Sequence, residues 1–418
     1  MSSELRVARL EEVLSFANGR TSPEREEAAP VPVFGSNGLI GQAREFNSPP
    51  NTIVIGRVGS YCGSVHFSRE ACWVTDNAIR ATAKGENDPN FLYYLLKQLN
   101  LNNWRSGSGQ PLINQTTLNA IETQIPYPRE QRAISGIVGA LDDRITLLRE
   151  TNATLEAIAQ ALFKSWFVDF DPVRAKMEGR TPEGMDEATA ALFPDGFETS
   201  ELGEVPRGWR VMPVGDAIEA VGGATPDTKN EAFWEPPVHC WTSPKDLSGI
   251  AAPVLLDTER KVSDQGLAKI GSGLLPSGTL LMSSRAPIGY LALAQVPLAI
   301  NQGYIAMLPG GLLPPLYMYF WCRHNMDNIK GRANGSTFME ISKKAFRPIP
   351  VLVPTNDLVT AFTATTEALF ARLTASEHQA QTLSTLRDTL LPRLISGQLR
   401  LPEAQAATEA ALGGTLSV

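Results

Sequence analysis

Two long stretches of the chain repeat apolar residues at alternating spacings of three and four, which is typical of helices that pack along a seam. One spans residues 129–168 and the other residues 356–399. Forty helical residues would extend about 60 Å at 1.5 Å per residue. Because a whole globular segment separates the two stretches, the simplest prediction is that they pack antiparallel as a central spacer.

The seam is mostly apolar, with two polar interruptions at Asn152 and Arg387. A buried polar side chain tolerates only the pairing that satisfies it, so these two residues would fix the register of the helices. The alternative is that both face solvent where the seam drifts. We nominate for helix pairing and subunit contact Leu141, Leu148, Asn152, Leu155, Leu162, Trp166, Leu369, Leu373, Leu383, Arg387 and Leu390.

The segments before the two stretches share landmarks in the same order, which indicates an internal duplication. The paired landmarks are 52–57 with 279–285, Asp76-Asn77 with Asn301-Gln302, Gly107-Ser-Gly-Gln-Pro with Asn334-Gly-Ser-Thr-Phe, and 125–128 with 349–354. Where measured, the separation stays between 225 and 227 residues. The first landmark in each copy is a short apolar strand that delivers an Arg, Arg57 or Arg285. We therefore expect two similar domains of mixed α/β (α+β) class.

The copies differ near their beginnings. The opening glycines, Gly19 and Gly222, are only 203 residues apart, so the second copy carries about 24 additional residues before its Thr279 strand. That segment, with Trp241, Lys245 and residues 257–261, has no counterpart that the sequence reveals. We divide the chain into a first α/β domain (1–128), a helix (129–168), a connector (169–206), a second α/β domain (207–355), a helix (356–399) and a C-terminal tail (400–418).

The formal net charge of −7 argues at first against a nucleic-acid partner. However, the connector holds ten acidic and three basic residues between Asp169 and Glu204, and its charge of −7 equals the net charge of the whole chain. The remainder is neutral and can still present a basic face. The second domain has a cluster of basic residues: Lys330, Arg332, Lys343, Lys344 and Arg347. The alternative is that this cluster is an ordinary solvent-exposed surface.

Apolar runs are far shorter than the roughly 20 residues of a membrane helix, and the first thirty residues have no signal-peptide core. We therefore expect a cytoplasmic protein that does not bind membranes. The four cysteines show no C-x-x-C spacing and are expected to be reduced thiols. The four histidines form no H-x-x-x-H pair, so no metal site is predicted.

Several fragments imitate catalytic motifs but lack the chemistry. Ser48-Pro-Pro-Asn51 is similar to the loop of amino-methyltransferases, yet Asn51 offers no aromatic ring to stack on an extruded base. Pro226-Asp227 with Glu259-Arg-Lys261 matches a loose nuclease pattern that only one copy carries. No G-x-x-x-x-G-K-[ST] loop is present, so ATP hydrolysis is not expected. The sequence therefore predicts no catalytic residue.

Five ordered motifs resemble the specificity subunits of type I restriction–modification systems, and the resemblance covers nearly the whole chain. Glu130-Gln-Arg-Ala-Ile134 enters the first helix, and Ala161-Leu-Phe-Lys-Ser-Trp-Phe-Val-Asp-Phe-Asp-Pro172 leaves it. The connector contains Phe193-Pro-Asp-Gly-Phe197 and Gly203-Glu-Val-Pro-Arg-Gly-Trp209. Leu390-Leu-Pro-Arg-Leu-Ile-Ser-Gly397 closes the second helix.

This resemblance implies that each α/β domain is a target-recognition domain that reads one half of a split, asymmetric sequence in double-stranded DNA. It implies that the paired helices set the gap and dock two modification subunits. Those partners would bind S-adenosylmethionine and methylate adenine, and two restriction subunits, with ATP and Mg²⁺, would add cleavage. The chain itself would need no cofactor.

Sequence readout requires side chains that offer donors to base edges, with Arg suited to guanine and Asn or Gln to adenine. For each candidate, the alternative is a structural role within its own domain, in a salt bridge or a turn. Our candidates for DNA contact are Arg57, Asn77, Gln110 and Asn114 in the first domain, and Lys245, Arg285, Gln302, Arg332, Lys343 and Lys344 in the second.

Two other functions stay open at this point. A fused nuclease or methyltransferase would require metal or cofactor chemistry that the sequence does not display. An adaptor that binds only protein through its coiled coil would be consistent with the acidic connector and the neutral domains.

Overall fold

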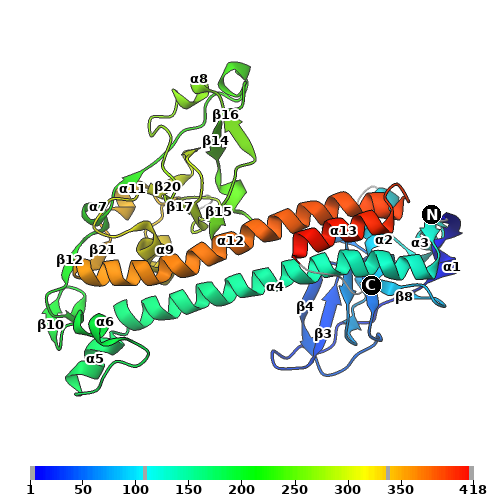
Figure 1. Ribbon diagram of the computed structural model, residues 1–418, viewed down its shortest axis with the longest axis horizontal. Coiled ribbons are helices and arrows are strands. Elements are labelled where there is room, and N and C mark those ends of the chain that lie inside the picture. Colours follow the sequence, from blue (N-terminus) through cyan, green and yellow to red (C-terminus); the bar gives the residue numbers. More distant parts are fainter. Residues whose placement is uncertain (1–4, 107–110, 336–338, 414–418) are drawn as a thin grey trace. The chain divides into compact units, whose positions relative to one another are not determined.

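A computed structural model describes residues 5–106, 111–335 and 339–413. The chain forms two compact units, residues 1–146 with 380–418 (unit 1) and residues 147–379 (unit 2). The two longest helices, α4 (Pro128–Phe167) and α12 (Asn356–Ile395), each contribute residues to both units (Figure 1). The predicted spacer helices are therefore built into the compact units rather than separate from them.

The first α/β domain combines a four-stranded antiparallel sheet, β2-β8-β5-β6, with a three-stranded sheet, β4-β3-β7, in which β3 and β7 are parallel. Strands β1 and β9, its first and last, pair with each other. Its elements are β1 (Leu5–Arg9), α1 (Leu10–Val13), β2 (Leu14–Asn18), β3 (Val31–Gly35), β4 (Gly38–Ala43), β5 (Thr52–Gly56), β6 (Val65–Ser68), β7 (Trp73–Val74), β8 (Ala78–Ala83), α2 (Pro89–Gln98), α3 (Gln115–Ala120) and β9 (Glu122–Pro126).

The second α/β domain repeats this order with one added strand. Its sheets are β13-β20-β17-β18-β15 and β16-β14-β19, and β12 pairs with β21. Its elements are β12 (Arg210–Pro213), α7 (Val214–Ala217), β13 (Ala220–Val221), β14 (His239–Thr242), β15 (Val254–Leu255), β16 (Arg260–Val262), α8 (Asp264–Leu267), β17 (Leu280–Ser283), β18 (Leu291–Ala294), β19 (Leu298–Ile300), β20 (Tyr304–Met307), α9 (Pro315–His324), α10 (Met326–Gly331), α11 (Lys343–Phe346) and β21 (Pro350–Val353).

The duplication extends to single hydrogen bonds. At the start of β5, the Thr52 hydroxyl donates to the carbonyl of Pro49, and just before β17 the Thr279 hydroxyl donates to the carbonyl of Pro276, both at 2.7 Å. The turns that precede these threonines contain a residue with positive φ in both copies, Asn51 (61°) and Gly278 (86°). The methyltransferase-like fragment at residues 48–51 is therefore a structural turn.

Part of the expected insertion in the second domain is not an insertion. Strand β14, which carries Trp241, and strand β16 have the same pairing as β3 and β4, one partner antiparallel and one parallel. The expectation that Trp241 and residues 257–261 lack counterparts is therefore wrong for Trp241, Arg260 and Lys261, whereas residues 257–259 lie in the added connection before β16. The side chains of these strands differ too much for the sequence to reveal the correspondence, whereas the backbone pairing of the strands is the same in both domains. The added elements are β15, which extends the sheet beside β18, α8, and two 3-10 helices, Glu231–Phe233 and Pro244–Leu247.

The connector and the tail are also folded. The connector contains α5 (Asp171–Met177), α6 (Glu187–Ala191) and a hairpin of β10 (Phe197–Ser200) and β11 (Gly203–Pro206). In the tail, which sequence reasoning left without structure, α13 (Leu401–Leu412) forms part of unit 1. Gly397 has a φ of 69° just beyond the end of α12, as expected of a glycine after a helix.

Helices α4 and α12 pack on each other in antiparallel orientation. Near one end the Arg387 guanidinium pairs with the Asp142 carboxylate at 2.6 Å, and near the other Phe163 and Phe362 meet edge to face with ring centroids 5.9 Å apart. The residue numbers rise along one helix as they fall along the other, which confirms the predicted antiparallel pair.

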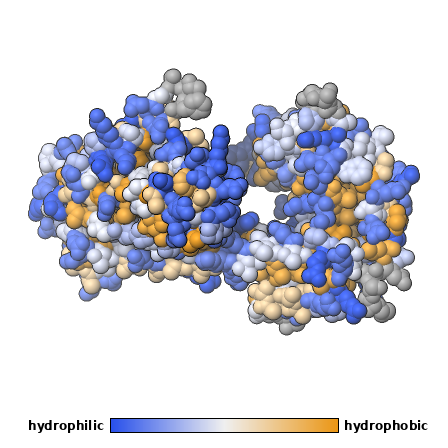
Figure 2. Space-filling model, turned by 90° about the horizontal axis from the view of Figure 1, so that it is seen from above, coloured by the Kyte–Doolittle hydropathy of each residue, from blue (hydrophilic) through white to orange (hydrophobic). Residues whose placement is uncertain are grey.

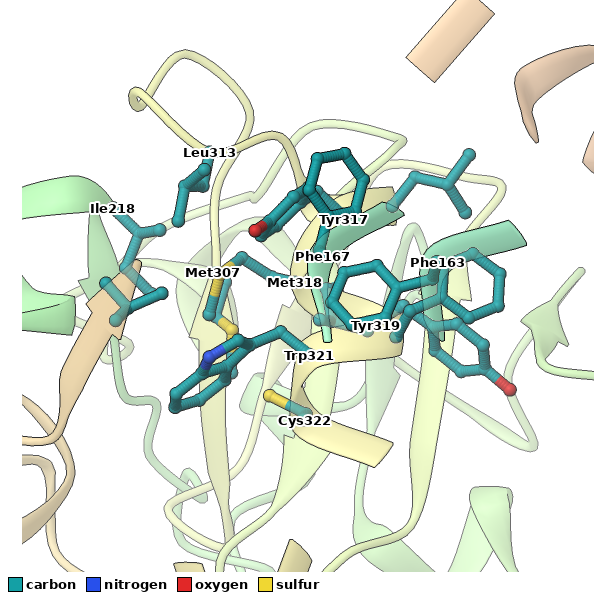
Figure 3. Packing of buried hydrophobic residues seen from close by; sticks show 14 of the residues in the cluster. Phe163, Phe167, Ile218, Met307, Leu313, Tyr317, Met318, Tyr319, Trp321 and Cys322 are labelled. Carbon is teal, nitrogen blue, oxygen red and sulfur yellow. The ribbon is translucent and has the colours of Figure 1, made fainter. Parts of the chain in front are cut away.

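The core of unit 2 is an aromatic cluster between α4, α12 and α9. Phe163 and Phe167 of α4 point toward Tyr317 of α9, with ring centroids 5.1 and 5.0 Å away (Figure 3). Phe362 of α12 contacts the same three rings. The cluster fixes the end of α4 and the start of α12 on the second α/β domain.

Two glycines occupy corresponding positions where no side chain fits. A Cβ atom on Gly19 would lie 2.0 Å from the carbonyl oxygen of Thr75, and one on Gly223 would lie 1.8 Å from that of Ile300. The opening glycine of the second domain is therefore Gly223 rather than Gly222, because this close backbone approach is what the position requires.

We predict that Gly223→Ala destabilises unit 2, because the added methyl group meets a backbone carbonyl that cannot move aside. The free energy of unfolding should fall by about 3 kcal/mol or more, measured by thermal unfolding. Gly271→Ala is the matched control, since a Cβ atom there meets nothing within 4 Å. Equal melting temperatures for the two variants would contradict the prediction.

Candidate nucleic-acid interface

In the first domain, three candidate residues meet at one end of the four-stranded sheet. Arg57 follows β5, and its backbone N–H donates to the carbonyl of Asn77 at 2.9 Å. The carbonyl of Arg57 accepts from Ile113, the residue before Asn114, at 3.0 Å. Backbone hydrogen bonds therefore bring Arg57, Asn77 and Asn114 together, although they are far apart in the sequence.

Their side chains differ in how much hydrogen-bonding capacity remains. Asn77 is exposed, whereas Arg57 is half-buried and its Nη1 donates weakly, at 3.4 Å, to the carbonyl of Asp76. The Asn114 side chain caps α3 by accepting from the N–H of Thr117 at 2.8 Å, so its oxygen is occupied. Gln110 lies outside the described residues.

The second domain has the same arrangement with different side chains. The N–H of Ser284 donates to Gly303 at 2.8 Å, and the N–H of Ile341 donates to Ser284 at 3.0 Å. Ser284 is thus the counterpart of Arg57, and Gly303 the counterpart of Asn77. The prediction that Arg57 corresponds to Arg285 and Asn77 to Gln302 is wrong by one residue. The similar side chains occupy neighbouring rather than identical positions in the hydrogen-bonded pairing of the strands.

Arg285 and Gln302 still lie at this end of the sheet, and both have partners. The Arg285 guanidinium lies 3.8 Å from the Glu340 carboxylate. The Gln302 side-chain oxygen accepts from the Thr225 hydroxyl at 2.7 Å, which leaves the amide nitrogen as its donor. The counterpart of the Asn114 cap is Ser342, which accepts from the N–H of Ala345 at the start of α11.

The remaining candidates are lysines and arginines of the exposed surface. Lys245 pairs with Glu259 at 2.9 Å, which raises the pKa of this lysine, and Arg332 donates to the Asn328 side chain at 3.1 Å. Lys343 and Lys344 begin α11 and are exposed. The structure thus groups Arg285, Gln302, Lys343 and Lys344 around the sheet end, and DNA contact by any of the candidates stays a prediction.

The nominated seam residues are mostly buried. Leu141, Leu148, Asn152, Trp166, Leu373, Leu383 and Leu390 are each at most 5% exposed, and Leu155, Leu162, Leu369 and Arg387 are half-buried. Asn152 is therefore inside rather than facing solvent, and neither atom of its amide has a hydrogen-bond partner in the described part of the chain. Their role in binding a partner subunit stays a prediction.

A hydrogen-bonded carboxylate ties each domain to α4. In unit 1, Asp142 accepts from the Tyr94 hydroxyl of α2 at 2.6 Å and also pairs with Arg387 of α12. In unit 2, Glu156 accepts from the Tyr319 hydroxyl of α9 and pairs with Arg323. Burial, together with the Asp142 carboxylate, raises the pKa of Tyr94, so its hydroxyl remains a donor at physiological pH. Sequence reasoning did not predict these links, because they join positions distant in the chain.

Sequence reasoning did not predict two further features of the surface. Trp234, Trp241 and Arg260 form a stack on the second domain.

Corresponding grooves also lie beside the two long helices. The groove of unit 1, about 470 Å³, is lined by Asn51, Asp88 and Asn90 with Arg132 and Asp143 of α4. The groove of unit 2, about 740 Å³, is lined by Gly278, Pro314 and Leu316 with Thr363 and Ala371 of α12.

The nuclease-like fragment does not assemble in the structure. Asp227 accepts from the N–H of Lys229, Glu259 pairs with Lys245, and Lys261 pairs with Asp257. Within the described ranges, no three His, Cys, Asp or Glu side chains are grouped as a metal site would require. Cys62, Cys72 and Cys322 are buried, which raises the pKa of each thiol.

The exposed surface is mixed in polarity. Figure 2 shows hydrophobic areas interleaved with hydrophilic residues on the face it views. Among the helices in the described part of the chain, none combines the length and the apolar character needed to cross a bilayer.

Comparison with known proteins gives consistent results. A family profile described as "Type I restriction modification DNA specificity domain" matches residues 2–157 and 206–357. The type I restriction enzyme HindI specificity subunit of Haemophilus influenzae is 28% identical over 71% of this chain and 72% of its own length. The MjaIX specificity subunit of Methanocaldococcus jannaschii is 32% identical over 38% of this chain and 37% of its own.

Among solved structures, the S subunit of a type I restriction–modification system from M. genitalium is similar in fold, with a TM-score of 0.60 and 18% identity. The similarity covers 94% of this chain and 96% of that one. Since the profile matches both halves and the halves share one fold, the chain belongs to the family of type I restriction–modification specificity subunits, the noncatalytic DNA-recognition subunits of these systems.

Proposed function

We propose that this chain reads a bipartite, asymmetric sequence in double-stranded DNA, with one α/β domain on each half, and directs methyltransferase and restriction subunits to that sequence. The observation that carries the proposal is the duplication of one backbone with different side chains at the same sheet end. Exposed Asp76 and Asn77 in the first domain correspond to Gln302 and Gly303 in the second. Different donors and acceptors on one scaffold suit two different half-sites.

The helix pair supports a fixed gap between the half-sites. Each helix has 40 residues, about 60 Å at 1.5 Å per residue, whereas DNA advances about 34–36 Å per turn. Two readers joined by such a pair would address segments more than one turn apart. A protein-only adaptor would not need two copies of a sheet with changed side chains at one end.

The chemistry belongs to the partners in this proposal. The chain carries no cofactor of its own, and S-adenosylmethionine, ATP and Mg²⁺ bind to partner subunits. Two modification subunits and two restriction subunits complete the complex on cellular DNA in the cytoplasm.

The corresponding grooves support the stoichiometry of two modification subunits. Each groove lies between the turn before β5 or β17, the beginning of α2 or α9, and the adjoining long helix, residues 132–143 of α4 or 363–378 of α12. Asn51 and Gly278 occupy the same position in the two grooves. Repeated surfaces are what two copies of one partner require.

The purified chain should show no methylation, whereas adding its methyltransferase subunits should produce methylated adenines within one two-part sequence. Incorporation of labelled methyl groups measures the first, and sequencing of methylated DNA measures the second. Activity of the chain alone would contradict the noncatalytic role, and binding of protein partners without sequence-selective methylation would support the adaptor instead.

Removing residues 147–153 and 376–382, seven facing residues from each long helix, should shorten the gap by about three base pairs. Seven residues span about 10 Å of helix, and one base pair about 3.4 Å. The seven-residue length preserves the seam. Mapping methylated sites for the shortened and full-length complexes measures the gap, and an unchanged gap would refute the spacer role.

Ala140→Arg in the groove of unit 1, or Ala371→Arg in that of unit 2, should each leave one modification subunit per chain instead of two. The long cation fills space that the partner would occupy. Native mass spectrometry reports the count, with Ala153→Arg, exposed on α4 outside both grooves, as the control. Two bound subunits in both groove variants would place docking elsewhere.

A further inference from the structure

Arg260 of the second domain packs against two tryptophan rings. Its guanidinium carbon lies 3.5 Å from the ring centroid of Trp234 and 5.4 Å from that of Trp241, its cross-strand neighbour. The rings meet edge to face at 5.2 Å. Their N–H groups donate to the carbonyls of Asp227 (3.1 Å) and Ala224 (3.2 Å), so both rings are anchored.

The stacked guanidinium keeps its donors available. Neighbouring cations are neutralised, since Lys245 pairs with Glu259 and Lys261 with Asp257. No carboxylate of the described chain lies within 4.0 Å of the Arg260 guanidinium, although the residue is exposed. Stacking occupies the face of the group and leaves its in-plane N–H fork free.

Arg260 is linked to the sheet end that carries the candidate DNA contacts. The segment that accepts from both tryptophans also contains Thr225, whose hydroxyl donates to Gln302 at 2.7 Å. The same segment begins at Gly222, where a Cβ would lie 3.5 Å from the end of the Lys343 side chain. Residues 222–227 thus connect the two tryptophans that hold Arg260 with Gln302 and Lys343.

The first domain has no arginine at the corresponding backbone position. Gly41 pairs with Val33 on β4 and β3 just as Arg260 pairs with Trp241 on β16 and β14. The tryptophan and arginine stack is therefore a difference between two readers that share a backbone.

We propose that Arg260 is a base-reading residue of the second domain, which donates two hydrogen bonds to the major-groove edge of a guanine while Trp234 and Trp241 fix its plane. A bidentate fork matches the two acceptors, O6 and N7, that guanine presents there. Fixing the plane beforehand reduces the conformational entropy lost on contact. This proposal rests on the proposed function, since it assigns one position of the half-site that the second domain reads.

The test uses the chain in complex with its methyltransferase subunits and DNA substrates that carry every single-base change of the methylated sequence. Arg260→Lys keeps the charge but loses the planar fork. It should reduce discrimination at one G·C pair of one half-site by about 5- to 150-fold, the range that a bidentate contact provides. Discrimination at the other positions should persist, and Arg260→Ala should give the same pattern.

Two further variants separate reading from folding. Lys261→Ala changes the next residue of β16, whose side chain points to the opposite face and pairs with Asp257, and it should leave discrimination unchanged. Trp234→Ala removes the stacking surface and should weaken discrimination at the same base pair only. Unchanged melting temperatures show that each variant is folded.

Three results would overturn the proposal. Equal discrimination by Arg260→Lys and the unaltered chain would show that no fork is used. A uniform loss of affinity for all sequences, with a salt dependence shallower by about one charge, would identify a phosphate contact instead. Loss of discrimination spread over both half-sites would indicate a folding defect. Failure of the proposed function is distinguishable, because the unaltered complex would then methylate no two-part sequence.

Discussion

The burial of aromatic rings where α4 ends and α12 begins is the interaction on which this architecture depends. Phe163, Phe167 and Phe362 pack against Tyr317, and Trp209, at the start of the second domain, packs against Phe167 with centroids 5.8 Å apart. Phe193 of the connector packs against Trp166 at 5.1 Å. Each ring buries a large apolar area. The cluster therefore joins two helices, the connector and the second α/β domain, and it places the aromatic motif at residues 161–172 and the motif ending at Trp209 in one core.

The two domains share a backbone scaffold but differ in the side chains proposed to contact DNA. Backbone pairing, the threonine hydrogen bond before the central strand and the glycine packed against a carbonyl are the same in both copies. The side chains at the sheet end are not, since Arg57 corresponds to Ser284 and Asn114 to Ser342. The strand pairing tolerates such exchange because it is made by main-chain N–H and carbonyl groups rather than by those side chains.

Charge on the second domain is organised by internal pairing. Lys245, Lys261 and Arg285 each have a carboxylate partner, whereas Arg260 is held by aromatic rings instead. An ion pair must be broken before its cation meets DNA, but a stacked arginine keeps its donors. The net charge of −7 is thus compatible with DNA recognition, because individual side chains rather than the total decide the contact.

The sequence by itself determined the duplication, the two seam helices with their antiparallel pairing, and the family, because periodicity and motif order are properties of the chain as written. Only the tertiary structure decided that Trp241 has a counterpart in Val33, that Arg285 is displaced by one residue from Arg57, and that Asn152 is buried. These facts depend on strand register and on which side chains fold against each other. Pairing between distant strands is set by backbone hydrogen bonds that leave no signature in residue type, so the corresponding positions, and the stack beneath Arg260, became visible only in the folded chain.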